Sequence, residues 1–152
     1  MSDSSSRQSE VFEEHLMINA ERIDKKPVDL LSEHTSLSKK AIKDCMQKGS
    51  VWLTRNAKTQ RLRRATRALE EGDELHLYHN PHVLNKQPEP PALVANHLKY
   101  SIWHKPAGMY SQGSRWGDHC TISRGIEVHS KPEKLGFTVH RLDRAASGLM
   151  MI

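Results

Sequence analysis

The sequence has 152 residues, of which 36% are hydrophobic and 27% charged, and its formal net charge is +5. This composition supports one ordinary domain or two small ones, and the positive charge suits an anionic partner such as a nucleic acid. Cys45 and Cys120 lie too far apart in sequence for a zinc ribbon, the amino terminus has no signal peptide, and no apolar run approaches the roughly 18 residues of a membrane helix, so we expect a cytoplasmic protein without a membrane anchor.

The first strongly predicted element is a helix over residues 35–49. Residues 1–12, at the start of the sequence, contain almost nothing that could be buried, and we expect them to form a disordered tail. The helix can begin with Ser36 or Ser38 as its capping residue, and apolar residues then recur on one face. Gly49 is expected to end it in the left-handed conformation that caps helices.

Two short strands are predicted after this helix. Residues 51–54 form the first. Gly72 and Asp73 are then expected to turn the chain, and Leu75 and Leu77 alternate with polar residues, as in a strand that has one buried face.

A proline-rich segment, residues 81–91, marks the predicted domain boundary. It holds four of the seven prolines and little that could be buried, which predicts a stiff, extended linker. Beyond this segment, the sequence predicts a strand that ends in a turn over residues 100–108. It predicts a second strand over residues 136–143. Residues 148–152 predict a buried central strand, because this run is apolar throughout.

The sequence stops inside that apolar run, whereas a chain terminus is usually polar and exposed. The roughly 60 residues after the predicted linker are also few for an independent core. We therefore expect the sequence to be a piece of a longer protein.

Basic residues are concentrated in the middle of the first half. Residues 39–67 contain ten lysines and arginines and one acid, whereas residues 70–74 contain four acids. Clustered cations neutralise phosphates and release counterions, so this segregation favours RNA binding over the plainer alternative of a solvated charged surface. The residues that we expect to contact RNA are Lys39, Lys40, Lys43, Lys48, Arg55, Arg61, Arg63 and Arg64.

The order of elements in this half resembles the alpha-L RNA-binding domain that is shared with a ribosomal small-subunit protein. The matching stretches are SLSKKAIKDCMQKGSVWL (36–53) and LEEGDELHLY (69–78), with Leu30 and Leu31 ending a preceding helix. The resemblance implies an RNA-binding domain over residues 13–80. The link between its two strands is longer and more basic than is usual in that family.

HRLDRAASGL, residues 140–149, places Asp143 between Arg141 and Arg144. The plain interpretation is a surface turn with a local salt bridge, which would contribute less than about 1 kcal/mol to stability. The alternative is a catalytic carboxylate whose charged form the two arginines favour by Coulomb attraction.

Together with HKPAGM (104–109), this stretch resembles the RluA family of RNA pseudouridine synthases. The family pattern has a Lys-Pro-x-Gly turn and, later, His-Arg-Leu-Asp followed by Ser-Gly-Leu. The resemblance implies that residues 92–152 are the first part of a mixed-sheet catalytic domain, and that the fold class is α+β. Ala146 departs from the pattern, since the family commonly has Thr at that position.

The resemblance also implies a role for each residue of the motif. Asp143 is the expected catalytic residue, acting either as a nucleophile at the anomeric carbon or as a base on the adjacent carbon. Arg141, Arg144, Ser147 and Gly148 are expected to position the substrate, with Arg141 helping to hold the target nucleotide out of its stack. The reaction needs no metal and no organic cofactor, and the Lys-Pro-Ala-Gly turn is expected to brace the sheet beneath the site.

Two competing motifs are weaker. The protein-kinase motif needs Asp directly after His-Arg and a later Asn, which this sequence lacks. His76, His79 and His82 are spaced as metal ligands could be, but they run from a strand into the proline-rich segment, so no fixed coordination geometry is implied.

The sequence therefore predicts a monomeric RNA pseudouridine synthase that acts on uridines of ribosomal or transfer RNA. The alternative is a non-catalytic RNA- or ribosome-binding module with an inactive synthase domain, and a third interpretation is a structural scaffold. Because an aromatic residue for the base and a cation for the phosphate are expected after residue 152, we expect residues 1–152 alone to be inactive.

Overall fold

The computed structural model describes residues 9–130 and 135–152, so the predicted disordered tail lies outside the described residues up to residue 8. The chain forms two compact units, Met1–Asn85 with Arg115–Gly117, and Lys86–Ser114 with Asp118–Ile152. Each contains an antiparallel sheet and at least one helix, a mixed α/β architecture that is compatible with the predicted α+β class. None of the helices in the described ranges is long and apolar enough to cross a membrane.

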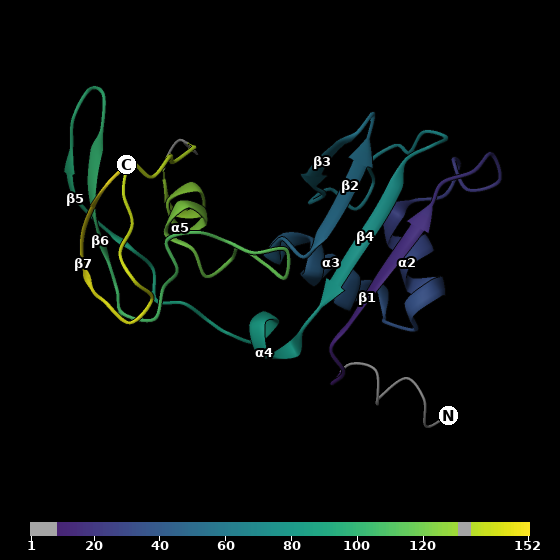
Figure 1. Cartoon of the computed structure of the whole chain (residues 1–152), viewed down its shortest axis with the longest axis horizontal. Coiled ribbons are helices and arrows are strands. Elements are labelled where there is room, and N and C mark those ends of the chain that lie inside the picture. The colour runs from purple at the N-terminus through teal and green to yellow at the C-terminus, as the bar shows by residue number, and fades with distance from the viewer. Residues whose placement is uncertain (1–8, 131–134) are drawn as a thin grey trace. The chain divides into compact units, whose positions relative to one another are not determined.

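The first unit contains a four-stranded antiparallel sheet with the strand order β1-β4-β2-β3. Figure 1 shows two helices, α2 and α3, together on one face of this sheet. Alternate residues of the central strands, among them Val51 and Leu75, point into the core that the helices cover, and both are fully buried. The elements are β1 (Phe12–Met17), α2 (Pro27–Thr35), α3 (Lys39–Lys48), β2 (Val51–Arg55), β3 (Lys58–Arg61) and β4 (Glu74–His79).

Helix α3 confirms the predicted helix and decides between its two candidate caps. The Ser38 hydroxyl accepts a hydrogen bond from the Ala41 backbone N–H at 3.1 Å. Ser36 instead ends α2, in the left-handed conformation with φ 61°. Gly49 has φ 83°, and its backbone N–H donates to the carbonyl groups of the last turn of α3, as a glycine cap does.

A buried ion pair joins the end of β2 to the turn before β4. The Arg55 guanidinium donates to both carboxylate oxygens of Asp73, at 2.8 and 2.7 Å, and Asp73 is 1% exposed. The Glu70 backbone N–H donates to the same carboxylate at 2.8 Å. The bond from Arg55 is the main reason why the pKa of Asp73 lies below its usual value, against the opposing effect of burial.

The segment predicted as an extended linker begins with a short helix, α4 (Pro81–Leu84). Asn80 caps this helix, and Leu84 is 4% exposed because it packs into the core of the first unit. The Lys48 ammonium also donates to the Leu84 carbonyl at 2.8 Å. Pro81 did not prevent the helix because the first helical position needs no N–H donor.

The second unit contains a three-stranded antiparallel sheet with the order β5-β6-β7 and, among its described residues, one helix, α5. Its small core consists of Trp103, Met109, Ile122, Ile126 and Met150. Its elements are β5 (Ala92–Asn96), β6 (Ser101–Lys105), α5 (Ile122–His129) and β7 (Gly148–Met151).

Strand β7 confirms a strand at the predicted place but not its predicted central position. Among the described residues β7 pairs only with β6 and is therefore an edge strand. Met150 is fully buried, whereas Leu149 and Met151 are 56% and 40% exposed. The continuous apolar run thus hides the alternation of a strand with one buried face.

The prediction of a strand over residues 136–143 is wrong, because the described structure has no helix or strand there. Phe137 and Val139, whose alternation suggested it, are 75% and 67% exposed. The segment reaches β7 through a side chain rather than through a backbone ladder, since the His140 Nε2 accepts the Met151 N–H at 3.0 Å.

Candidate active site

Two loops of the second unit meet around Asp143. One follows β6 and contains the Lys-Pro-Ala-Gly turn, and the other leads into β7. Gly108 has φ 90°, which favours glycine, and its backbone N–H donates to the Arg144 carbonyl at 2.6 Å. The Asp143 carbonyl accepts the Ala146 N–H at 3.0 Å, so Asp143 begins a tight turn.

The residue before Asp143 is held by Ser111. The Ser111 hydroxyl donates to the Leu142 carbonyl at 2.7 Å, and the Leu142 N–H donates back to that hydroxyl oxygen at 3.1 Å. Ser111 is buried, and Leu142 packs against the core of this unit. The backbone is therefore fixed on both sides of Asp143.

The side chain of Lys105 links the two loops. Its side chain is buried, and the ammonium donates to the Met109 carbonyl at 2.7 Å, the Pro106 carbonyl at 3.2 Å and the Arg144 carbonyl at 3.5 Å. Burial lowers the pKa of Lys105, and the negative charge of Asp143 opposes that effect. The Lys105 ammonium therefore links the loop after β6 to the loop that leads into β7.

Asp143 itself is exposed, as is Arg141. In the described part of the chain, no ion pair joins the Asp143 carboxylate to Arg141 or Arg144. The salt bridge of the plain interpretation is therefore not formed. A carboxylate on a rigid turn that faces solvent is available to a substrate.

The Arg144 side chain contacts a tyrosine that the sequence did not reveal. Its guanidinium donates to the Tyr110 hydroxyl at 2.9 Å and lies 5.4 Å from the centre of the ring. The Lys86 ammonium donates to the same hydroxyl at 3.2 Å. The hydrogen bond from Arg144, followed by that from Lys86, lowers the pKa of Tyr110. Neither contact has a signal in sequence spacing, because the three residues come from three separate segments.

The two small residues after the turn lie where the chain passes beside the Lys-Pro-Ala-Gly loop. Ser147 is exposed, and Gly148 lies opposite Lys105 in the register of β6 and β7. Gly148 has φ 155°, a backbone conformation that residues with side chains rarely adopt, whereas a Cβ atom there would make only an ordinary contact of 3.4 Å with the Leu142 side chain.

In the first unit, several of the predicted RNA contacts are already used within the protein. Lys39 pairs with Asp29 at 2.9 Å, Lys48 pairs with Asp44 at 2.9 Å, and Arg55 pairs with Asp73. Arg61 donates to the Gly49 carbonyl and lies 4.2 Å from the centre of the Trp52 ring, and Arg63 donates to the Gln47 carbonyl at 3.0 Å. The exposed members of the predicted set that have no such contact among the described residues are Lys40, Lys43 and Arg64.

The structure does not bring together His76, His79 and His82, whose spacing in the sequence is compatible with a metal site. His76 and His79 lie on opposite faces of β4, and the His79 ring packs on Phe12, with its Nδ1 against the Glu10 carbonyl at 2.9 Å. His82 is exposed on α4.

Residues 99–152 match the family model described as RNA pseudouridylate synthase. No curated protein matches the chain. The matched range contains both loops and Asp143, and it supports a pseudouridine synthase family for this part of the chain, with an isomerase activity on RNA at that coarse level.

Proposed function

We propose that the protein is an RNA pseudouridine synthase of the RluA type, with Asp143 as its catalytic residue. The observation that carries the proposal is the fixed turn. Leu142 and Arg144 are both fastened by buried partners, so the Asp143 carboxylate is exposed at a defined place. The match of residues 99–152 supports the reaction class.

In the proposed reaction the bond between N1 of uracil and C1′ of ribose breaks, the base turns, and C5 bonds to C1′. The hydrogen on C5 leaves as a proton, so no redox change occurs and the reaction needs no cofactor. Asp143 assists the bond breaking either by attacking C1′ or by taking a proton from C2′.

The neighbouring residues would hold the nucleotide around this carboxylate. Arg141, which is exposed beside Asp143, would contact the strand from which the base is extruded. The bond from Arg144 to Tyr110 would place its guanidinium at the edge of the site, and Ser147 with Gly148 would let the backbone approach.

We further propose that residues 13–80 are an alpha-L domain that binds ribosomal or transfer RNA. Its contact surface would centre on the exposed cations Lys40, Lys43 and Arg64, while Arg61 and Arg63 shape the loop through the backbone of α3. The protein would act as a monomer in the cytoplasm.

Neutralising Lys40, Lys43 and Arg64 together is expected to weaken RNA binding. Each lost phosphate contact should also make the negative slope of log K against log salt less steep by about 0.7 to 0.9. Fluorescence anisotropy of labelled RNA between low and moderate salt measures both effects. The control is Lys25→Gln, since this exposed lysine of the same unit pairs with Glu33. An unchanged slope in the triple variant would show that these cations face solvent only.

The proposed activity is tested with RNA that carries tritium on C5 of uridine. The complete gene product should release tritium to water, and the RNA should contain pseudouridine at defined positions. RNA binding without tritium release would favour the alternative, a non-catalytic RNA- or ribosome-binding module, to which Ala146 in place of the usual Thr also points.

A further inference from the structure

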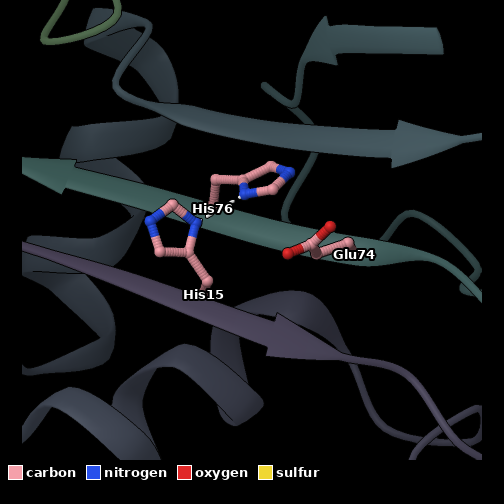
Figure 2. Close-up of side chains that lie close together, drawn as sticks. All are labelled: His15, Glu74 and His76. Atoms are coloured by element: carbon pink, nitrogen blue, oxygen red, sulfur yellow. Dashed lines mark hydrogen bonds between the residues drawn. The ribbon is translucent and has the colours of Figure 1, made fainter. Parts of the chain in front are cut away.

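Two histidines and a glutamate lie together on the exposed face of the sheet in the first unit. His15 comes from β1, and Glu74 and His76 come from β4. Figure 2 shows the two imidazole rings facing each other across the strands, with the Glu74 side chain beside them on the same face. This face lies opposite the one that α2 and α3 cover (Figure 1).

The register of the sheet brings these side chains together. His15 and His76 are directly opposite each other in the antiparallel pair, and Glu74 precedes His76 by two residues, so all three point the same way. The Nδ1 atoms of the two rings are 2.7 Å apart. One potential ligand atom from each of the three residues lies within 4.8 Å of the other two.

The far side of each ring has its own partner. The His76 Nε2 is 2.8 Å from the Thr54 hydroxyl, which in turn lies 2.7 Å from the Thr59 hydroxyl. The His15 Nε2 is 3.8 Å from the Glu13 carboxylate. The 3.8 Å distance to Glu13 allows an ion pair but not a hydrogen bond. When the His76 Nε2–H donates to Thr54, the lone pair of the His76 Nδ1 faces His15, which is the arrangement of histidines that bind metals.

We propose that His15, Glu74 and His76 form a binding site for a divalent transition metal, with Zn²⁺ as the best fit. Two imidazole nitrogens and one carboxylate oxygen are a donor set that suits Zn²⁺ and leaves a fourth position for water. The site is independent of the proposed uridine isomerisation and lies in the other unit.

Only small movements are needed to admit the ion. At Zn–N distances of about 2.0 to 2.1 Å, two nitrogens of a tetrahedral site lie about 3.3 Å apart. The Nδ1 atoms must therefore separate by about 0.6 Å, which a small rotation of the exposed His15 ring supplies. The carboxylate of Glu74 must move closer, and its side chain has enough rotatable bonds to do so.

Calorimetric titration of the tag-free protein with Zn²⁺ tests the site. We expect one strong binding event per chain, and a shift of the ring nitrogens of His15 and His76 in NMR spectra recorded with Zn²⁺. His15→Ala and His76→Ala should each weaken binding at least tenfold. Thr54→Val, which removes only the outer partner of His76, should weaken it less than His76→Ala does.

The matched control is His82→Ala, which removes an exposed histidine of the same unit and should leave the affinity unchanged. His15→Gln serves as a second variant, because position 15 is exposed and the change keeps a polar side chain. Absence of Zn²⁺ binding, or binding that survives both His15 variants unchanged, would overturn the site.

Discussion

Replacing Asp143 with asparagine is expected to abolish pseudouridine formation by the complete gene product, with a loss of about 1000-fold or more. Asparagine keeps the shape of the side chain but can neither attack C1′ nor accept a proton from C2′. The backbone of the turn is held through Leu142 and Arg144, so the substitution should leave the fold unchanged. Release of tritium from C5-labelled RNA measures the rate.

RNA affinity should change less than twofold in the same variant, because the proposed binding cations lie in the other unit. The control is Glu89→Gln, which removes one negative charge from an exposed residue of the second unit. It should retain full activity. Turnover by Asp143→Asn at a rate close to that of the wild type would remove Asp143 from the mechanism.

The second large effect concerns the ion pair between Arg55 and Asp73. Arg55→Met should lower the free energy of unfolding of the first unit by about 3 kcal/mol, because it leaves the carboxylate of Asp73 buried without its cation. The control Lys58→Met, at an exposed position of the neighbouring strand β3, should cost less than about 0.5 kcal/mol. Denaturant unfolding followed by the NMR signals of β2 and β4 separates this unit from the other.

The same ion pair predicts how stability depends on pH. The pKa of Asp73 is lowered in the folded protein, so its contribution is fully present above the unfolded pKa of about 3.9. That contribution is lost as the pH falls through the folded pKa. The Arg55→Met variant should therefore show a smaller loss of stability in acid than the wild type, and equal losses would show that Asp73 does not carry this dependence.

Sequence patterns correctly predicted the helices and strands whose ends are determined by contacts between neighbouring residues. Ser38 and Gly49 bound α3 through contacts within one turn, so the sequence alone could locate the helix. Strand β3, by contrast, is an exposed strand of four polar residues, and its sequence carries no hydrophobic period. It forms because β2 pairs with it, and no local pattern in its sequence predicts it.

In the candidate site, too, residues close together in the sequence were predicted and residues brought together only by the fold were not. Asp143 and its flanking residues were found because they form one contiguous motif. Ser111 and Tyr110 were missed because they reach the motif only through the fold, across 31 and 34 residues of sequence. Lys86 was missed because it contacts Tyr110, 24 residues away, and not the motif itself. The pairing of His15 with His76 spans 61 residues and depends on the register of β1 against β4, which no local pattern specifies.

The proposal that Asp143 catalyses uridine isomerisation is tested most directly by mapping pseudouridines in the RNA of cells that lack the gene. We predict that one or a few defined uridines lose the modification, that the wild-type gene restores it, and that the Asp143→Asn gene does not. Unchanged pseudouridine at every position in the deleted cells, or full restoration by the Asp143→Asn gene, would contradict the proposed function.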